Sequence, residues 1–347
     1  MSGVQFLIVA DEDGDQRLDR WLRRMFPHVN QGRIEKMCRK GELRVEGGRV
    51  KPATRLEAGQ KVRIPPLPVP GAREEKPKMR VSEKDAKMIR DCVIYMDDDI
   101  IAINKPAGLP TQGGSKQTKH VDGLSEALSF DLEEKPRLVH RLDKDTSGVL
   151  LLARNRAAAQ GLTAAMRHKE TRKIYWAVVA GVPTPYLGEI KYGLVKAPGH
   201  GRRGEGEKMI CLHPRDVDST PGAKRAITQY ATLYRVASRA SWVAMEPITG
   251  RTHQLRAHMA EIGHPIAGDG KYGGSAQENM GDGWGAKIGG IISNKLHLHA
   301  RSMTFEHPVT RKDVTITAEL PEHIAHTFDT FGWTPDLAAD DPFEELR

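Results

Sequence analysis

The chain has 347 residues, of which 39% are hydrophobic and 28% are charged. This length suggests two folding units, each large enough to hold a hydrophobic core. No apolar run approaches the roughly 18 residues that a transmembrane helix requires, so we expect no membrane partner. The 53 Lys and Arg residues outnumber the 45 Asp and Glu residues and give a formal net charge of +8. A basic excess of this kind favours a polyanionic partner such as nucleic acid.

The chain contains three cysteines, Cys38, Cys92 and Cys211, which lie far apart and form no Cys-x-x-Cys pair. An odd number at such spacing argues against a disulfide framework and against a zinc cluster. The histidines at positions 253, 258 and 264 lack the i, i+4 spacing of a helical pair of metal ligands, so no metal site is expected. Because residues 1–15 lack the apolar region of a secretory signal, we expect a cytoplasmic protein.

The first predicted domain covers residues 15–65. Apolar side chains between residues 18 and 26 recur at spacings of three and four, which predicts an amphipathic helix. A second helix is expected over residues 31–40. Two short strands, at residues 42–46 and 60–64, are expected to follow it.

Positive charge is concentrated in this first block. Residues 16–65 contain 14 basic and 5 acidic side chains, an excess of nine that exceeds the net charge of the whole chain. The polar faces of the two helices offer candidate contacts to RNA phosphates: Arg20, Arg24, Arg33, Lys36, Arg39 and Lys40. The alternative is an ordinary solvated surface. The string RLDRWLRRMFPHVNQGRIEKMCRKGELRVEGGRV, residues 17–50, resembles an S4 domain, a small RNA-binding module of ribosomal proteins and RNA-modifying enzymes.

A stretch rich in proline and charge follows this block, and we predict a linker over residues 66–91. The second predicted domain covers residues 92–333, where short β-like runs alternate with glycine-rich breaks. Residues 334–347 are acidic and are expected to fray. The letters G-x-G-x-x-G occur at residues 268–273, but the polar, glycine-rich segment after them indicates a loop and not a dinucleotide site.

The candidate catalytic residue is Asp143, within the string LVHRLDKDTSG of residues 138–148. An apolar run at residues 149–153 follows and predicts a buried strand, so Asp143 is expected at the end of a sheet. Residues 145–147 have a plainer explanation as a turn that caps free backbone groups. Three basic neighbours would tend to keep the Asp143 carboxylate ionised: His140, Arg141 and Lys144.

Two further candidates come from predicted regular elements. Leu255, Met259 and Ile262 predict a helix over residues 252–262, with Arg256 at the edge of its buried stripe. A partly buried guanidinium needs a carboxylate partner, although an ordinary surface arginine is the alternative. In a strand expected at residues 173–181, Tyr175 is either a core residue or an aromatic ring that stacks on a base.

Six ordered blocks resemble the RluA-type pseudouridine synthases: residues 97–108, 139–148, 173–181, 250–256, 263–273 and 296–308. With the S4-like block, the layout is similar to the RluC and RluD branches, which act on large-subunit (23S) ribosomal RNA. The resemblance implies an α+β protein, in which a mixed, largely antiparallel sheet follows a small α/β S4 domain. One departure is visible, because many relatives have a histidine near Gly113 where this chain has Thr111 and Gln112. We expect that departure to affect substrate contacts more than chemistry.

The resemblance also implies roles for single residues. Asp143 would be the essential aspartate, Tyr175 the active-site aromatic and Arg256 the partner of Asp143, with the nearby basic residues close to backbone phosphates. Isomerisation of uridine to pseudouridine needs a carboxylate as nucleophile or base, and no metal or other cofactor. The implied partner is ribosomal RNA, with no obligate protein partner. Two other classes remain open, namely a non-catalytic RNA-binding or ribosome-assembly factor and an RNA glycosidase.

Overall fold

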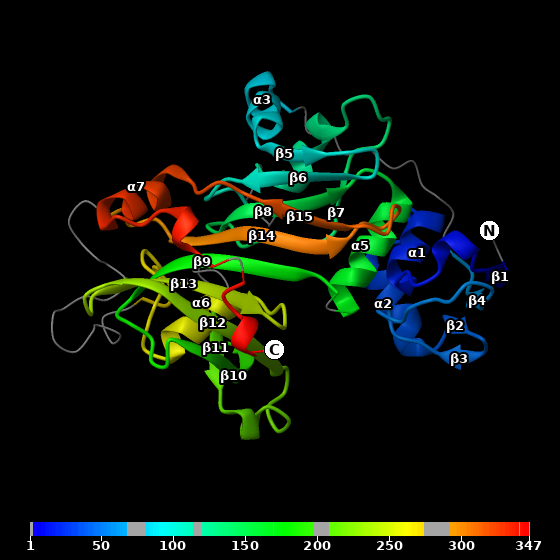
Figure 1. Ribbon diagram of the computed structural model, residues 1–347. Helices are drawn as coiled ribbons and strands as arrows, with labels where there is room; N and C mark the ends of the chain where they lie inside the picture. The colour runs from blue at the N-terminus through cyan, green and yellow to red at the C-terminus, as the bar shows by residue number, and fades with distance from the viewer. Residues whose placement is uncertain are drawn as a thin grey trace. The chain divides into compact units, whose positions relative to one another are not determined.

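The computed structural model describes residues 3–67, 81–113, 119–168, 170–197, 208–273, 292–339 and 341–346. Two compact units make up the chain, Met1–Met79 and Arg80–Arg347 (Figure 1). In the described ranges, no helix is both long enough and apolar enough to span a membrane.

The first unit packs two helices on a four-stranded antiparallel sheet. Helices α1 (Leu18–Met25) and α2 (Gln31–Lys40) form where the sequence predicts them, and Gly41 ends α2 in the left-handed conformation that favours glycine. The sheet has the order β1-β4-β2-β3: β1 (Gln5–Ile8), β4 (Lys61–Ile64), β2 (Arg44–Val45) and β3 (Gly48–Arg49). Strand β1 was not predicted, so the unit begins before residue 15.

The second unit is built on one large sheet. Its main path runs β11-β10-β12-β13-β9-β14-β8-β6-β5, while β15 pairs with β14 and β7 with β8. Among the described strand pairs, only β14 and β8 run parallel, so the predicted mixed, largely antiparallel sheet is confirmed. The strands are β5 (Val93–Met96), β6 (Ile100–Lys105), β7 (Arg137–Leu138), β8 (Ser147–Ala153), β9 (Arg172–Ala180), β10 (Leu187–Lys196), β11 (Met209–Leu212), β12 (Lys224–Val236), β13 (Ala240–Pro247), β14 (Leu298–Glu306) and β15 (Asp313–Thr317).

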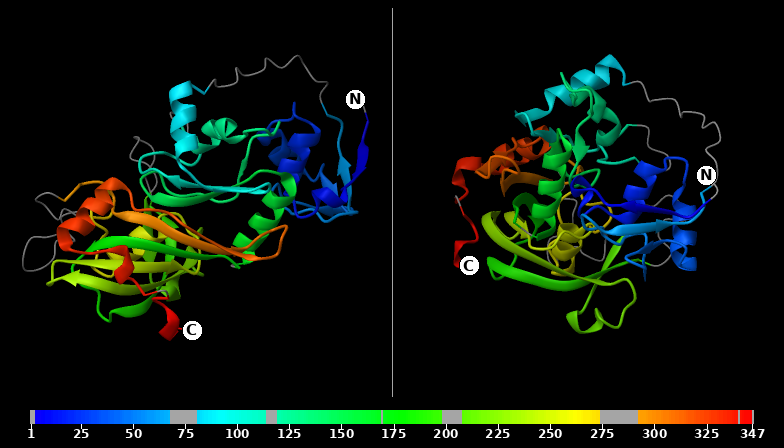
Figure 2. Two further views of the ribbon diagram at one scale, coloured as in Figure 1. Left: turned by 45° about the horizontal axis from the view of Figure 1, so that its top comes forward. Right: turned by 90° about the vertical axis from the view of Figure 1, so that its right-hand side faces the viewer.

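Helices cover both faces of this sheet. Near strands β6 and β8, α3 (Glu83–Asp91) and α4 (Val121–Leu124) pack on one face and α5 (Arg156–His168) on the other. Figure 2 shows α3, in cyan, beside α4 at this end of the sheet. Near strands β9 and β13, α6 (Gln254–Glu261) covers one face and α7 (Glu322–Phe331) the other.

The linker and the tail differ from their predictions. Residues 68–80 lie outside the described residues, but α3 occupies most of the rest of the predicted linker. Ser82 caps its first turn and Ile89 is fully buried, so this segment belongs to the second unit. At the other end, Phe343 is also fully buried and Arg172 forms an ion pair with Asp341. Burial of that aromatic ring holds a tail that was expected to fray.

Three buried histidines in the second unit make its stability depend on pH. Burial lowers the pKa of His258, His297 and His299 to about 4, from an ordinary value of 6.5. Between these values the unfolded chain binds protons that the folded chain does not bind. We therefore expect the free energy of unfolding to fall as the pH is lowered from about 6.5 towards 4.

Urea unfolding followed by circular dichroism, at steps between pH 7 and pH 5, measures this effect before most carboxylates are protonated. His299 contacts Ser147 Oγ at 2.9 Å, and a glutamine in its place does not titrate. The His299→Gln variant should therefore show a shallower pH dependence than the wild type. A wild-type stability that stays constant from pH 7 to pH 5 would contradict the expectation.

Candidate active site

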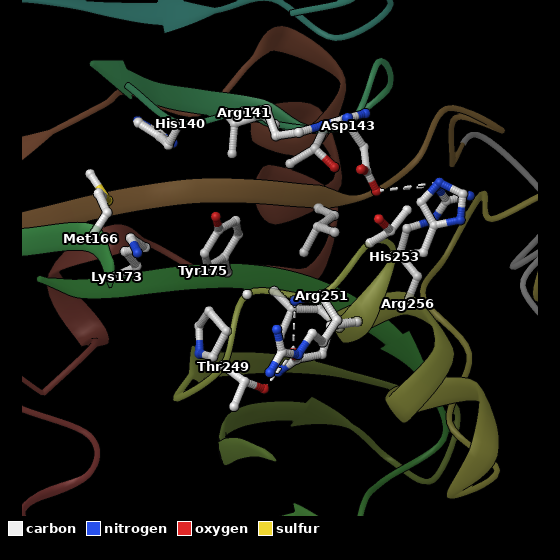
Figure 3. A pocket seen from close by; sticks show the side chains of 18 residues that line it. His140, Arg141, Asp143, Met166, Lys173, Tyr175, Thr249, Arg251, His253 and Arg256 are labelled. Atoms are coloured by element: carbon white, nitrogen blue, oxygen red, sulfur yellow. Dashed lines mark hydrogen bonds and ion pairs between the residues drawn. The ribbon is translucent and has the colours of Figure 1, made fainter. Parts of the chain in front are cut away.

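A pocket of about 320 Å³ opens in the second unit where three segments meet. They are the loop between β7 and β8, the start of β9, and the loop that leads into α6. Figure 3 shows Tyr175 in the middle, with Lys173 on one side and Asp143, His253 and Arg256 on the other. The pocket therefore gathers all three residues to which the family resemblance assigns catalytic roles.

The register of the sheet places Asp143 near Tyr175. Gly148 of β8 pairs with Ala300 of β14, which in turn pairs with Tyr175 of β9. A Cβ atom on Gly148 would lie 2.2 Å from the carbonyl oxygen of Ala300, and its φ of 109° also favours glycine. Glycine at position 148 thus allows β8 and β14 to approach each other. Residues that precede Gly148 in the chain line the pocket.

The loop that carries Asp143 is held on both sides. Before it, the hydroxyl of Thr111 donates to the carbonyl of Leu142 at 2.7 Å and accepts from the N–H of Leu142 at 3.1 Å. After it, the ammonium of the fully buried Lys105 donates to the carbonyl of Lys144 at 3.1 Å. Thr111 and Lys105 therefore both help to position the loop that carries Asp143.

Arg256 contacts two carboxylates. Its Nη1 lies 3.5 Å from Asp143 Oδ2, as the resemblance implies. Its stronger partner is Asp269, whose two oxygens accept from Nε at 2.7 Å and from Nη2 at 2.8 Å. Burial opposes the charge of Arg256, but the hydrogen bonds to Asp269 and the nearby negative charges of Asp269 and Asp143 together outweigh burial and raise the pKa of the guanidinium. The bidentate pair holds Arg256 in place, and Nη1 remains directed at Asp143.

Helix α6 is more deeply buried than its pattern predicts. Seven of its eight residues are buried, including Arg256, which was placed at the edge of the apolar stripe. Gln254 anchors the first turn, because its amide nitrogen donates to the carbonyl of Ile227 and to the hydroxyl of Thr228, both at 2.9 Å. A helix buried on nearly all sides fixes its side chains more firmly than a surface helix does.

Tyr175 is a core residue whose ring also reaches the pocket, and base stacking by this ring stays a prediction. Tyr175 packs against the same core cluster as Ala177 and Val179, while Trp176 and Val178 join the cluster on the opposite face, as alternation predicts. Its ring also lines the pocket. Burial raises the pKa of its hydroxyl, and the charge of Asp143 raises it further, so this group stays protonated at neutral pH.

The basic residues around Asp143 have three different placements. Arg141 is exposed and lines the pocket. His140 also lines it, but Nε2 accepts from the N–H of Leu151 at 2.9 Å, and burial lowers the pKa of the ring to about 3. His140 is therefore neutral and adds no positive charge beside Asp143, while its contact with RNA stays a prediction. Lys144 is exposed beyond the pocket lining.

The six predicted RNA contacts of the first unit lie on α1 and α2, and all except the partly buried Arg33 are exposed. Arg24 forms an ion pair with the buried Asp13, and Lys40 lies 3.8 Å from Glu42. These acids already neutralise part of their charge. Four of the six form no ion pair within the described part of the unit: Arg20, Arg33, Lys36 and Arg39. The three of these that are exposed, Arg20, Lys36 and Arg39, are the strongest remaining candidates.

Sequence reasoning missed three residues at the site. Asp269 and Tyr272 lie in the loop that was set aside as a false nucleotide motif, and His253 was considered only as a metal ligand. His253 Nε2 lies 3.8 Å from Asp143 Oδ2, and its Nδ1 lies 3.0 Å from the Tyr272 hydroxyl. The sequence did contain one signal for Asp269. A partly buried Arg256 needs a carboxylate partner, and Asp269 lies only 13 residues away along the chain.

One cluster outside the pocket has the residue types of a metal site. Asp97, Asp99 and His307 have ligand atoms within 4.8 Å of one another. The carboxylate of Asp97 already accepts from the backbone N–H groups of Asp99 and Ile100, and from the hydroxyl of Tyr95. These contacts explain the cluster as a cap on the turn before β6.

Comparisons with known proteins agree with this arrangement. The sequence profile described as RNA pseudouridylate synthase matches residues 99–261, and the S4 domain profile matches residues 16–62. A ribosomal large subunit pseudouridine synthase C from Haemophilus ducreyi is 36% identical, over 93% of this chain and 94% of that protein. The protein of the same name from Escherichia coli K12 is 36% identical, over 91% and 92%. This chain belongs to the RNA pseudouridylate synthase family.

Solved structures support the fold of this pseudouridine synthase. Human RNA pseudouridylate synthase domain containing 4 aligns with a TM-score of 0.55 and 26% identity, over 71% of this chain and 95% of that chain. Human RNA pseudouridylate synthase domain containing 1 aligns with a TM-score of 0.50 and 21% identity, over 70% and 95%. The profile of the family includes Asp143, Tyr175 and Arg256, whereas Asp269 and Tyr272 lie beyond its end.

Proposed function

We propose that this pseudouridine synthase isomerises uridines of large-subunit (23S) ribosomal RNA, with Asp143 as the catalytic carboxylate. The substrate class is supported by relatives named for the ribosomal large subunit, which align over more than nine-tenths of the chain. The catalytic assignment is carried by one observation. Asp143 is a partly exposed carboxylate at a pocket, with a buried guanidinium 3.5 Å from one oxygen.

The reaction fits a pocket whose described lining contains one carboxylate, that of Asp143. The bond between N1 of uracil and C1′ of ribose breaks, the base turns, and a bond forms between C5 and C1′. The proton on C5 is lost and N1 gains one, so no atom is added or removed. The carboxylate acts as a nucleophile at C1′ or C6, or as a base at C2′, and all three routes use the same carboxylate.

The other pocket residues would support this chemistry. Arg256 keeps Asp143 charged and oriented, which lowers the cost of reaching the reacting geometry. The target uridine must leave its stack at a cost of a few kcal/mol, and the Tyr175 ring could offset part of it by stacking on the base. Burial lowers the pKa of Lys173, and this side chain forms no ion pair within the described ranges, so it remains available to the RNA backbone.

The test is to mix the purified protein with unmodified transcripts of large-subunit RNA. Carbodiimide adducts that persist on pseudouridine are then mapped by primer extension, with small-subunit transcripts as the control. New stops on large-subunit RNA alone are the expected result. Free uracil with abasic sites would indicate a glycosidase, and unchanged RNA would indicate a binding protein, so either result would overturn the proposal.

We also propose that the S4 unit binds the RNA through the exposed faces of α1 and α2. Changing Arg20, Lys36 and Arg39 together to glutamine should weaken RNA binding. It should also reduce the slope of log affinity against log salt concentration by up to about 3, if each side chain contacts one phosphate. Filter binding at several salt concentrations measures both quantities.

A matched variant removes the same charge from the strand side of this unit, at Arg49, Lys51 and Lys61. If both triple variants lose the same affinity, overall charge and not the helical face determines binding.

The three cysteines are unpaired, which fits the expected reducing compartment, and we include a cytoplasmic location in the proposal.

A further inference from the structure

His253 stands directly beside Asp143 at the start of α6. Its backbone has a φ of 52° and a ψ of 22°, the left-handed conformation that residues other than glycine rarely adopt. The His253 side chain is only 10% exposed, and this conformation directs it at the loop that carries Asp143. Its Nε2 lies 3.8 Å from Asp143 Oδ2, and Nδ1 lies 3.0 Å from the hydroxyl of Tyr272. Strain of this kind is kept where the surrounding structure requires it.

The Tyr272 hydroxyl has two neighbours that determine where its proton points. The backbone N–H of Met209 donates to it at 2.9 Å, and this N–H can only donate. The remaining neighbour is His253 Nδ1, which becomes the acceptor for the single proton of the hydroxyl. Burial raises the pKa of Tyr272 to about 12, so that proton is present at neutral pH.

If Nδ1 accepts, the neutral imidazole carries its proton on Nε2, the atom that faces Asp143. The other tautomer would direct the lone pair of Nε2 at a carboxylate oxygen and would leave the Tyr272 proton without its acceptor. Burial lowers the pKa of His253 and favours the neutral ring. The charged or titratable groups that act on it come from three segments: Asp143, Arg256, Asp269, Lys271 and Tyr272.

We propose that His253 is a positioning residue, which directs Nε2–H at Asp143 across 3.8 Å in a tautomer set by Met209 and Tyr272. Both His253 Nε2 and Arg256 Nη1 approach the same oxygen, Oδ2. Two N–H groups of positive polarity that face the same oxygen favour one rotation of the carboxylate and leave Oδ1 for the substrate. This inference rests on the proposed function, because it assumes that Asp143 is the catalytic carboxylate.

Two substitutions of similar polarity separate this role from a merely structural one. The side-chain amide of glutamine reaches the position of Nε2, whereas that of asparagine reaches only the position of Nδ1. We expect His253→Asn to lower kcat by about 10- to 100-fold, the scale of the loss when a reacting group is misplaced, with little change in KM for RNA. His253→Gln should recover most of kcat. His264→Asn is the control, because this histidine follows the same helix and binds the carbonyl of Ala180.

A third variant tests the hydrogen-bond chain itself. Tyr272→Phe keeps the ring but cannot donate to Nδ1, so it should lower kcat as His253→Asn does. The double variant should be no slower than His253→Asn alone, because both changes break one chain. Steady-state assays, which give kcat and KM, and melting temperatures are measured for every protein.

Three results would each overturn the inference. They are a wild-type kcat in His253→Asn, a kcat in His253→Gln that is no higher than in His253→Asn, and losses that add in the double variant. If the wild type itself forms no pseudouridine on any transcript, the proposed function fails instead. If His253→Asn does not fold, the other two variants still test the inference. It requires a lowered kcat in Tyr272→Phe and a kcat close to that of the wild type in His253→Gln.

Discussion

Asp143→Asn is expected to abolish pseudouridine formation, with a loss of at least about 1,000-fold in single-turnover rate, while RNA binding is retained. The amide has the volume of the carboxylate and can still accept a hydrogen bond from Arg256. It lacks the negative charge that attack or proton removal requires. Arg256 keeps its bidentate partner Asp269, so no buried cation is left unpaired and the melting temperature should change little.

Asp145→Asn provides the matched control, because this exposed carboxylate is two residues away in the same loop and lines a neighbouring pocket. Its activity should stay near that of the wild type. Primer extension after carbodiimide treatment gives the activity, and filter binding gives the affinity. Pseudouridine formed by Asp143→Asn at more than a trace would show that another group performs the chemistry.

Elements that depend on local interactions were predicted more accurately than elements that depend on contacts between distant parts of the sequence. Helix α2 was predicted with its observed bounds because its signals are local, with Asn30 as the N-terminal cap and Gly41 after the last turn. Strand β1 was missed because its evidence is distant. Gln5–Ile8 pairs with Lys61–Ile64, more than fifty residues later, and four residues alone form no strand.

Helix α3 shows how composition can mislead. Its neighbours are rich in proline and charge, and Glu83–Asp91 offers few apolar residues, so it was included in the linker. Ala86 and Ile89 are buried by the cluster that includes Val121 and Leu124. Contacts across more than thirty residues stabilise this helix, and no local periodicity reports them.

The candidate site was predicted in part for the same reason. Asp143, Tyr175 and Arg256 occupy one pocket, and the argument that Arg256 needs a carboxylate correctly anticipated an ion pair. Which of the two carboxylates, Asp143 or Asp269, forms the bidentate pair with Arg256 depends on the turn that carries Asp269. Gly268 adopts a φ of 74° there, and a Cβ atom would lie 2.0 Å from the carbonyl of Lys295. Sequence spacing does not determine such a turn.

Asp269→Asn is expected to weaken both the fold and the activity. The Asp269 side chain is fully buried and forms a bidentate pair with Arg256, and breaking a buried pair on one side costs about 3–5 kcal/mol. Asparagine can still accept from the backbone N–H groups of Lys271 and Tyr272, so the loop keeps part of its structure. The uncompensated guanidinium is then free to turn fully towards Asp143 and to occupy the oxygen that the substrate needs.

A double variant separates the two effects. Arg256→Met combined with Asp269→Asn removes the buried charge together with its partner, so a large part of the lost unfolding free energy should return. Activity should stay low, because Asp143 then lacks the guanidinium that keeps it charged and oriented. Urea unfolding and single-turnover assays on the wild type, the two single variants and the double variant measure both quantities. If activity returned with stability, Arg256 would serve the fold alone, and its contact with Asp143 would have no part in the chemistry.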